Sequence, residues 1–463
     1  MKTKFSRMAK ERILALLLRL LWAAALVLPA FGASAGVVFT NLYSFTGTND
    51  GANPQAGLVQ GKDGYFYGTT YSGGTNNHGT IFKISTNGAL TSLYSFALYD
   101  GAGPEAGLVQ GSDGYFYGTT GSGGKYTNGL GANLNLGIVF KISPTGAFTS
   151  LHSFDETNGA SPQCALVQGS DGYFYGTTFG SGAAGYGQGE GASVFKISTG
   201  GMLTNLHQFF GITTYNGCSI EISGQYNDGA NPRAGLVQGS DGYFYGTTYY
   251  GGTNGLCNAG GPGFIFTTYG AVFKISTNGV VTMLHSFTGA DGQHPRAGLV
   301  QGSDGNFYGT TYNGGTTFSG LTPPGYGTVF QITAAGAFTS LYSFAQTNFP
   351  SSIGLNPWAG LVQGSDGSFY GTTALGGLAG AGTVFRLAIV PPHLAIAPSG
   401  ANVILSWPTD YVGFTAGFTL EFATNLTSPT VWQTNSTSPV VIGDQNVVTN
   451  PISGTQMFFR LTQ

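Results

Sequence analysis

Apolar residues recur in short clusters along most of the chain, separated by glycine, asparagine or aspartate. Within a cluster they occupy both alternating sets of positions, as in AGLVQG, YFYGTT and GTIFKIS between residues 56 and 85. A strand covered on one face only would alternate apolar and polar residues, so this pattern indicates strands covered on both faces. Asp-Gly or Asn-Gly pairs follow many clusters and favour tight hairpin turns. The chain is therefore predicted to be all-β.

One phrase dominates the sequence: GLVQGKDGYFYGTT at residues 57–70, which occurs in six copies. The other five copies begin at Gly107, Ala165, Gly235, Gly298 and Gly360. Successive turn aspartates lie 50, 58, 70, 63 and 62 residues apart, which is typical of β-propeller blades with loops of variable length. These aspartates are Asp63, Asp113, Asp171, Asp241, Asp304 and Asp366.

Each repeat is predicted to contain four strands. In the first repeat they are AGLVQG at residues 56–61, YFYGTT at 65–70, GTIFKIS at 79–85 and ALTSLYSF at 89–96. Blades converge toward a central axis, where inner strands have little room for side chains. Gly57, Gly68 and their copies are expected to relieve that crowding.

The sixth repeat lacks a fourth strand, because it ends near Ala388 soon after the third-strand Phe385. The missing phrase stands at the other end of the chain, in VVFTNLYSF at residues 37–45. We therefore predict a six-bladed β-propeller over residues 37–388, closed by pairing of this N-terminal strand with the strand around Phe385. An open solenoid is the alternative, but it leaves both the extra strand and the incomplete repeat unexplained.

The phrases AGLVQGSDGYFYGTT, GTVFKIS and LYSF resemble the tandem repeats of the exported bacterial GloVer family. The resemblance covers roughly residues 37–388 and implies an extracellular, surface or envelope repeat protein. It implies no catalytic residues. Many such proteins end in an apolar helix with a basic tail, and this chain does not.

Residues 393–463 have a different pattern from the repeats, after a linker at 389–392. Short β-type runs separated by proline, asparagine and glycine predict a small β-sandwich. With Trp407, their spacing resembles a fibronectin type III-like module. The runs are residues 403–407, 418–422, 431–434, 440–442 and 457–461.

Residues 1–35 have the layout of a signal peptide: basic positions, an apolar run from Leu20 to Leu28, and Ala33-Ser34-Ala35 before the expected cleavage. An uncleaved anchor is the alternative, but Arg19 leaves the apolar stretch short of the roughly 20 residues that span a bilayer. We expect a secreted or envelope protein, monomeric, with no transmembrane segment in the mature chain. Removing residues 1–35 leaves ten basic and eighteen acidic residues, a net charge of −8, which argues against nucleic acid as a partner.

The three cysteines have no metal-ligand or redox-motif spacing. Cys218 and Cys257 flank the same repeat in long insertions and can form a disulfide in an oxidising compartment, an alternative left open. Cys164 replaces an alanine and is expected to be a small buried residue. No cofactor is predicted.

A variable position marks the candidate ligand site. In the repeated Pro-x-Ala-Gly segment before each innermost strand, x differs between copies. The residues at x are Gln55, Glu105, Gln163, Arg233, Arg296 and Trp358. In a closed propeller they would surround the channel mouth on the face of the long loops, where they could bind a polar ligand, with Trp358 against a sugar. Alternatively, x is a solvated position free to vary.

Other loop residues carry weaker signals. Asp50, Asp100, Asp228 and Asp291 stand in Asp-Gly-x-x-Pro segments, which fit turns better than calcium sites. Aromatic residues that begin the variable loops could stack on glycans or pack at blade edges. These are Tyr71, Phe179, Tyr249, Tyr250 and Tyr312.

Little in the sequence predicts catalysis. Ten of the eighteen acidic residues stand in the turn motifs, and His152, His207 and His285 replace the tyrosine of the LYSF phrase. No GxSxG, HExxH or P-loop motif is present, so no catalytic residue is predicted. We expect a non-catalytic binding or structural protein that recognises polysaccharide or a cell-surface protein. The alternative is an extracellular carbohydrate hydrolase or lyase with its site at the channel mouth.

Overall fold

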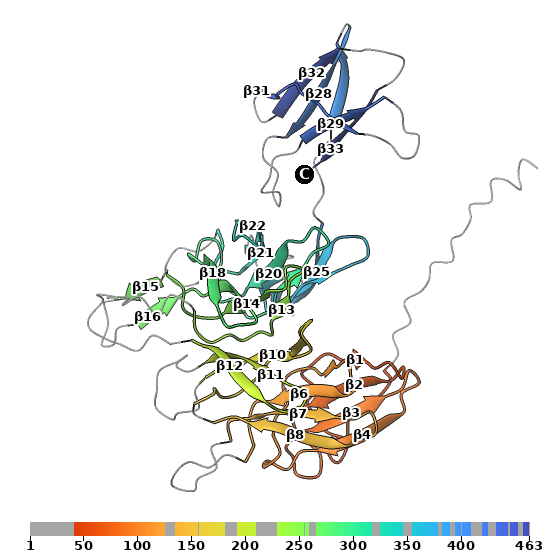
Figure 1. Cartoon of the computed structure of the whole chain (residues 1–463), viewed down its shortest axis with the longest axis vertical. Coiled ribbons are helices and arrows are strands. Elements are labelled where there is room, and N and C mark those ends of the chain that lie inside the picture. The colour runs from red at the N-terminus through yellow and green to blue at the C-terminus, as the bar shows by residue number, and fades with distance from the viewer. Residues whose placement is uncertain are drawn as a thin grey trace, which may run out of the picture. The chain divides into compact units, whose positions relative to one another are not determined.

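The computed structural model is all-β, and none of the residues it describes is helical. It describes residues 41–125, 135–155, 157–180, 192–209, 229–253, 255–258, 265–316, 325–345, 354–377, 382–388, 394–399, 401–408, 419–424, 432–442, 445–451 and 457–462 (Figure 1). The chain divides into two compact units, residues 1–44 and residues 45–463. The predicted signal peptide and the disulfide between Cys218 and Cys257 lie outside the described side chains.

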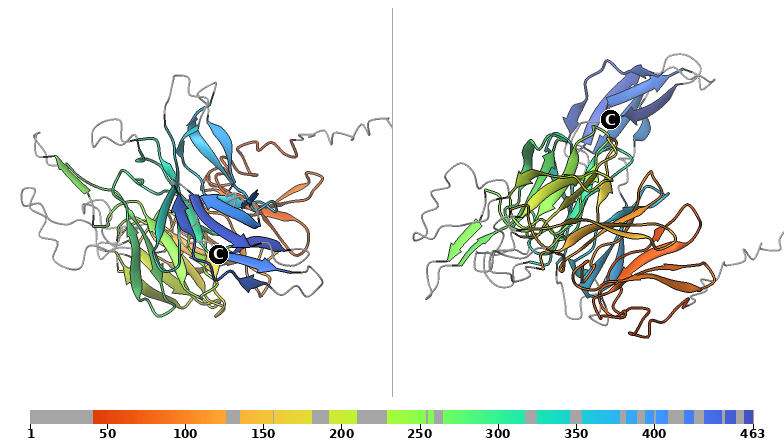
Figure 2. Two further views of the ribbon diagram at one scale, coloured as in Figure 1. Left: turned by 90° about the horizontal axis from the view of Figure 1, so that it is seen from above. Right: turned by 60° about the horizontal axis from the view of Figure 1, so that its bottom comes forward.

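Each of the six repeats forms its own antiparallel sheet, and we call these repeat sheets 1 to 6 (Figures 1 and 2). Sheet 1 contains β1 (Val59–Gln60), β2 (Phe66–Thr70), β3 (Thr80–Ile84) and β4 (Leu90–Ser95). Sheet 2 contains β5 (Val109–Gln110), β6 (Phe116–Thr120), β7 (Ile138–Ile142) and β8 (Phe148–Ser153). Sheet 3 contains β9 (Val167–Gln168), β10 (Phe174–Thr177), β11 (Ser193–Ile197) and β12 (Leu203–Gln208). Sheets 4 and 5 are β13 (Val237–Gln238), β14 (Phe244–Thr248), β17 (Ala271–Ile275), β18 (Val281–Ser286); and β19 (Val300–Gln301), β20 (Phe307–Thr311), β21 (Thr328–Ile332), β22 (Phe338–Ser343). The order matches the prediction.

Two repeats depart from the common pattern. In sheet 4 the loop after β14 forms an extra pair, β15 (Gly255–Asn258) with β16 (Ile265–Thr268). Sheet 6 contains β24 (Val362–Gln363), β25 (Phe369–Gly376) and β26 (Thr383–Leu387), and β23 (Gly354–Pro357) pairs with the far end of β25. Among the described residues, β26 pairs with β25 alone, and the predicted pairing of β26 with residues 37–45 is not seen.

The Asp-Gly turn is built differently from a two-residue hairpin. In sheet 1 the Gly64 N–H donates to the Gly61 carbonyl and the Gly61 N–H to the Tyr65 carbonyl. Only Gly64 has a positive φ, 84°. This is a type I turn that ends in a glycine with a left-handed backbone. The left-handed conformation explains why the glycine is repeated, and Asp63 itself keeps an ordinary backbone conformation with negative φ.

The turn aspartate also accepts a hydrogen bond from a buried tyrosine, a role that was not predicted from the sequence. In sheet 1 the Tyr67 hydroxyl donates to the Asp63 carboxylate at 2.6 Å, and the same bond recurs in every repeat sheet at 2.6 to 2.8 Å. The carboxylate therefore satisfies a hydroxyl that the buried tyrosine would otherwise leave unpaired. Burial, followed by this bond to Asp63, raises the pKa of Tyr67 well above its usual range.

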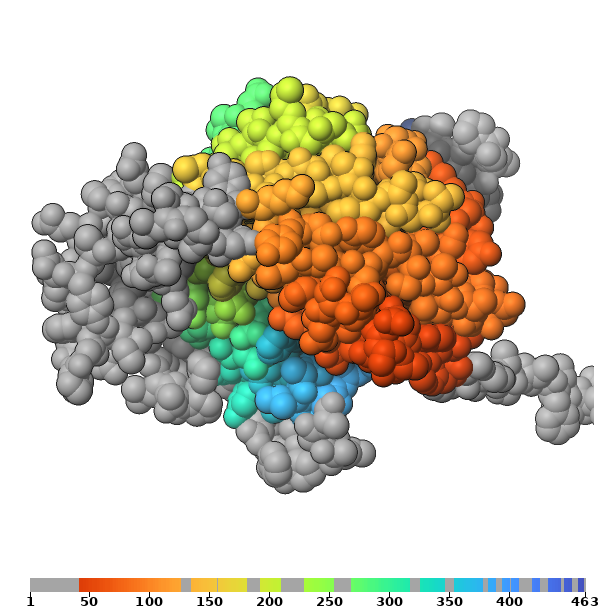
Figure 3. Space-filling view, turned by 90° about the horizontal axis from the view of Figure 1, so that it is seen from below, coloured from red at the N-terminus to blue at the C-terminus, as the bar shows by residue number. Residues whose placement is uncertain are grey.

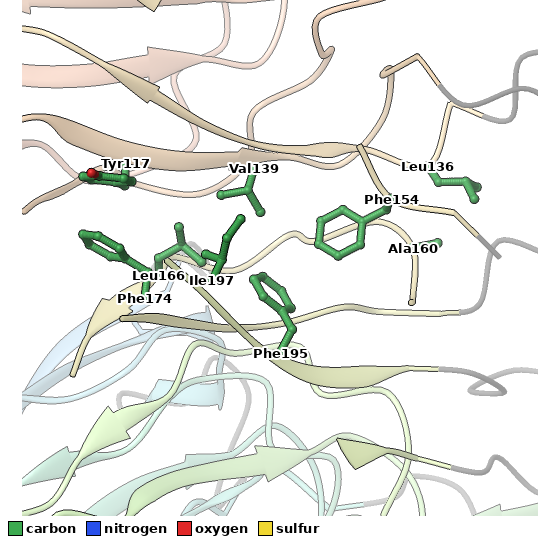
Figure 4. Packing of buried hydrophobic residues seen from close by; sticks show 9 residues of the cluster. All are labelled: Tyr117, Leu136, Val139, Phe154, Ala160, Leu166, Phe174, Phe195 and Ile197. Atoms are coloured by element: carbon green, nitrogen blue, oxygen red, sulfur yellow. The ribbon is translucent and has the colours of Figure 1, made fainter. Parts of the chain in front are cut away.

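Successive repeat sheets are joined by an aromatic stack. Tyr175 of sheet 3 lies on Phe244 of sheet 4 with ring centroids 3.9 Å apart, and all five successive interfaces repeat the contact at 3.8 to 4.0 Å. Figure 4 shows the interface of sheets 2 and 3, where Tyr117 faces Phe174 and the Phe154 and Phe195 rings pack together. Figure 3 shows the first three sheets, orange to yellow, in continuous contact.

Backbone crowding between sheets occurs at some of the predicted glycines but not at all of them. A side chain at Gly235 would approach the Ala165 carbonyl oxygen of the preceding sheet to 2.8 Å, so only glycine fits without a shift. Gly57, in the first sheet, has no atom in its side-chain direction within 4 Å. At Gly68 the crowding comes from Leu58 and Phe82 of the same sheet instead.

The two terminal repeat sheets each have one open face. Leu58 of sheet 1 is 53% exposed, whereas its five counterparts are at most 8% exposed. On sheet 6, Val384 is 79% exposed, although the equivalent residues of the other sheets are fully buried. Residues 41–45 form no strand, and residues 37–40 lie outside the described part. Closure by residues 37–45 therefore stays a prediction.

Residues 394–462 contain two further antiparallel sheets. One contains β27 (Ala395–Ser399), β28 (Asn402–Pro408), β32 (Gln445–Pro451) and β31 (Val440–Ile442), and the other β30 (Gln433–Thr434), β29 (Thr419–Ala423) and β33 (Phe458–Thr462). Leu405, Trp407 and Val448 of the first share a buried cluster with Leu420 of the second. Five of these strands coincide with predicted runs, whereas β27 and β32 were not predicted.

The isolated polar residues of the repeats are structural. Cys164 is buried as expected, and burial raises the pKa of its thiol to about 11. His285 lies edge-on to Phe287 at 5.2 Å, as Tyr94 does to Phe96 at 5.5 Å, and its imidazole contacts Asp291 as the Tyr94 hydroxyl contacts Asp100. The histidine therefore replaces the tyrosine in packing, as the repeat alignment suggested.

We predict that Phe244→Ala lowers the free energy of unfolding by about 3–5 kcal/mol, because it empties a fully buried site between sheets 3 and 4. Urea denaturation followed by tryptophan fluorescence measures the change. Val280→Ala is the matched control, since Val280 precedes β18 in sheet 4 and is 66% exposed. Equal effects of the two substitutions would contradict the role given to the stack.

Candidate functional site

A shared backbone feature presents the six candidate residues. Each follows a proline, and the residue before that proline has a left-handed backbone with φ between 53° and 59°. Asparagine tolerates this conformation better than most residues, which explains its use in three of the six copies. The residues before the prolines are Asn53, Gly103, Ser161, Asn231, His294 and Asn356.

Two of these asparagines also fix an aromatic residue of the preceding sheet. The Asn231 side chain donates to the Phe179 carbonyl at 2.9 Å, and Asn356 donates to the Tyr312 carbonyl at 2.8 Å. Phe179 and Tyr312 are thereby held beside the candidate residues of the next sheet, Arg233 and Trp358.

The structure brings three of the six candidates into one stacked arrangement. The guanidinium carbon of Arg233 lies 5.1 Å from the Phe179 ring centroid and 4.2 Å from that of Tyr249. That of Arg296 lies 5.2 Å from the Tyr249 centroid, 4.3 Å from Tyr312 and 3.9 Å from Trp358. We call Phe179, Arg233, Tyr249, Arg296, Tyr312 and Trp358 the Arg–aromatic ladder.

The two arginines carry charge that no described carboxylate balances. The ion pairs of the described residues lie elsewhere, at His285–Asp291, Arg386–Asp366 and Arg460–Glu421. The Nε atoms of Arg233 and Arg296 are buried without a hydrogen-bond partner. Burial lowers the pKa of Arg233, and the nearby charge of Arg296 lowers it further. Guanidinium groups stay protonated at any physiological pH, so the ladder is a local cationic site.

Two other candidates lie near each other in the second and third repeats. There Gly121 replaces the loop aromatic, and a side chain at Gly121 would meet Glu105 Oε1 at 3.4 Å and Gln163 Cγ at 3.7 Å. The Glu105 and Gln163 side chains therefore converge on the space that the absent ring leaves. Burial raises the pKa of Glu105. Gln55 is exposed, and the described contacts do not join it to the others.

His294 is part of the support beneath the ladder. Its imidazole stacks on Tyr249 with centroids 4.5 Å apart. Its Nε2 donates to the Thr268 carbonyl at 3.1 Å, and Nδ1 accepts from the Asn313 amide at 3.3 Å. These bonds require a neutral ring. Burial lowers the pKa of His294 to about 4, and both ladder arginines add to the shift.

The Asp-Gly-x-x-Pro aspartates act as turn residues where they are described. Asp50 accepts from the Thr46 N–H at 2.8 Å, Asp100 from Ala97 at 2.7 Å, and Asp291 from Thr288 at 2.8 Å. Asp228 lies outside the described residues. Across the described side chains, no three His, Cys, Asp or Glu residues are grouped as metal ligands would be.

The repeats match a known family. The model for the Gloeobacter/Verrucomicrobia repeat matches residues 31–258 and 255–395, which is more than half of the chain. The chain belongs to this family. The match confirms the resemblance drawn from the repeated phrases. The described part of this Gloeobacter/Verrucomicrobia repeat protein contains no helix with the length and apolarity needed to cross a membrane.

Solved structures are similar to this repeat protein only distantly. A gluconolactonase from Xanthomonas campestris is 11% identical, with 73% of this chain and 87% of that chain covered and a TM-score of 0.38. A PQQ-bound aldose sugar dehydrogenase from Streptomyces coelicolor is 12% identical, with 73% and 95% covered and a TM-score of 0.38. A comparison with curated proteins found no match.

Phe179, Tyr249 and Tyr312 were predicted from the sequence to stack on glycans or to pack at blade edges. Their contacts with the two arginines were not predicted. Each ring contacts a residue more than 40 positions away along the chain, in the next repeat. The signal that could have found the pairing is the repeat itself, since the loop aromatic and the residue after proline occupy fixed positions in it.

We predict that His294→Asn reduces acid sensitivity, since Asn53, Asn231 and Asn356 show that asparagine suits this left-handed position. The unfolded imidazole takes up a proton as pH falls from 6.5 to about 4, and the buried one does not. The contribution of neutral His294 to the free energy of unfolding is therefore fully present above pH 6.5. It falls as the pH is lowered toward 4, and the total loss is at most about 3 kcal/mol. Urea unfolding at pH 7 and pH 4.5 measures it. A wild-type loss no larger than that of the variant would contradict the assignment.

Proposed function

We propose that this protein is an exported, non-catalytic binding module that recognises polysaccharide through the face carrying its variable loops. The observation that carries the proposal is the Arg–aromatic ladder, which holds two arginines beside a half-exposed tryptophan. Trp358 is 54% exposed, and the Arg296 guanidinium covers one of its faces. A half-exposed aromatic ring beside partly buried arginines offers a ligand an apolar face and charged donors in one place.

Carbohydrate suits this chemistry better than an apolar ligand. Sugar rings present C–H groups to an aromatic face and hydroxyl acceptors to guanidinium donors, and the ladder offers both within one site. A binding role is favoured over the activity of a hydrolase or lyase because Glu105 is the one carboxylate at the six candidate positions. Glycoside hydrolysis ordinarily needs two carboxyl groups across the scissile bond.

We further propose that the six repeat sheets are the blades of a closed propeller, with residues 37–45 as the fourth strand of the sixth. Phe45 supports this, because it lies edge-on to Phe82 of sheet 1 at 5.2 Å. The last phenylalanine of each LYSF-type strand makes the same contact with the following sheet at 5.2 to 5.5 Å. Phe45 therefore occupies the place of a preceding blade's final residue.

The remaining domain assignments follow the same reasoning. Residues 393–463 are proposed to be a β-sandwich of fibronectin type III-like kind, supported by the buried cluster that its two sheets share. Residues 1–35 are proposed to direct export, which places the mature, monomeric protein outside the cell or in its envelope. A cell-surface protein is the other partner class that the loop face could bind.

Closure predicts an unusual stability result at Tyr370. Tyr370 is only partly buried on sheet 6, but in a closed ring it would stack on Phe66 as Tyr175 stacks on Phe244. Tyr370→Ala should then lower the free energy of unfolding by about 3–5 kcal/mol, as much as Tyr175→Ala. Urea denaturation of both variants compares them. A cost below about 1 kcal/mol for Tyr370→Ala alone would indicate an open array.

The binding proposal is tested on a glycan array with the chain lacking residues 1–35. We expect binding that the triple variant Arg233→Ala/Arg296→Ala/Trp358→Ala loses by more than tenfold, since it removes both donors and the platform. Arg386→Ala is the control, because Arg386 pairs with Asp366 at the turn end of sheet 6. Equal array signals from the triple variant and the wild type would remove the site.

A further inference from the structure

We propose that the ligand of the Arg–aromatic ladder is an acidic polysaccharide, whose carboxylate or sulfate groups bind between Arg233 and Arg296. This inference rests on the proposed function and names the class of glycan that the same site would take. Three features of the ladder lead to it: the missing counter-charge, the scarcity of hydrogen bonds to the arginines within the described residues, and the half-exposed tryptophan beside them.

The positive charges of Arg233 and Arg296 lie close together without a balancing carboxylate among the described residues. Both guanidinium carbons lie within 5.2 Å of one ring centroid, that of Tyr249, so two like charges share a neighbour. Like charges repel, and partial burial weakens the screening of that repulsion, so a nearby anion would stabilise the pair. Within the described residues neither arginine has such a partner. An anion supplied by a ligand would balance both.

The described residues occupy few of the arginine donors. The hydrogen bond from Arg296 Nη2 to the Tyr249 hydroxyl, at 3.3 Å, is the one that the described residues provide for this pair. Because the Nε atom of each arginine is buried, the terminal Nη groups are the donors left for a ligand. These groups match two oxygens of a carboxylate or sulfate, and such charge-assisted bonds are about twice as strong as neutral ones.

The platform identifies the anion as part of a sugar chain. Trp358 lies against Arg296 and edge-on to Tyr312 at 5.4 Å, and half of its surface is open. A sugar ring on Trp358 would place a substituent within reach of the Arg296 guanidinium. An inorganic anion would use the arginines but not the tryptophan. A neutral glycan would use the tryptophan but leave the two charges unbalanced.

The overall charge of the protein makes the site selective. Without residues 1–35 the chain carries a net charge of −8, so a polyanion is repelled by most of the surface and attracted at the ladder. Binding should therefore weaken with added salt by an amount that reflects two contacts, because only two cations take part.

The experiment pairs acidic glycans with neutral counterparts of the same backbone. Isothermal titration of the chain lacking residues 1–35 would use polygalacturonate oligomers against their methyl esters, and dextran sulfate against dextran. We expect at least one acidic member to bind about tenfold or more tightly than its neutral partner. Binding by polygalacturonate identifies the carboxylate as the recognised group, and binding by dextran sulfate alone identifies the sulfate.

Two variants locate the effect. Arg233→Gln/Arg296→Gln should reduce the preference for the acidic member to about twofold or less, whereas Arg386→Gln should leave it unchanged. A thermal melt of each variant establishes that it is folded. If the double variant is unstable, Arg233→Lys/Arg296→Lys keeps the charge but loses the planar stack and should bind more weakly with its salt dependence intact.

The remaining outcomes separate the two proposals. Equal binding of acidic and neutral members overturns the acidic class while leaving polysaccharide recognition in place. An unchanged preference in the folded double variant overturns the ladder as the anion site. Failure of every glycan, on the array as well as in titration, overturns the proposed function together with this inference.

Discussion

The contact on which the structure depends is the stack of one tyrosine on the phenylalanine of the next repeat. Each repeat sheet has two apolar faces, and one sheet cannot bury either of them alone. The Tyr–Phe pair recurs at every successive interface, with Tyr175 and Phe244 fully buried. An aromatic side chain of this size buries about 150–250 Å², so the pair contributes a large apolar contact to each interface.

The stack also explains why a carboxylate is repeated in the hairpin turn. A tyrosine buried between sheets brings a hydroxyl with it, and that hydroxyl needs an acceptor. Asp171 provides one for Tyr175 at 2.7 Å while also accepting from the Tyr173 N–H at 3.2 Å. Turn shape, hydroxyl pairing and sheet packing are thus served by one short phrase, so the phrase is repeated while the loops vary. The loops present different side chains at one fixed position, and the Arg–aromatic ladder is the result.

Much of this could be predicted from the sequence, because strands and turns are local. The third strand was expected at residues 79–85 and occupies Thr80–Ile84, and the run at 440–442 is β31. β27 and β32 were missed, since Pro398 and the polar residues of 445–451 hide their strand character. The ladder could be predicted only in part, because Arg233 and Phe179 meet through the packing of two repeats. Closure lies beyond the described contacts, as it depends on a segment far from its partner in the chain.

The most direct measurement of the stack is a double-mutant cycle on Tyr175 and Phe244. Tyr175→Leu, Phe244→Leu and the double variant keep apolar volume at both positions while removing the ring pair, and urea denaturation gives their free energies of unfolding. The stack predicts a coupling of about 0.5–1.5 kcal/mol between the two rings. Additive effects, with a coupling below about 0.3 kcal/mol, would show that the two residues contribute separately and that the stack does not join the sheets.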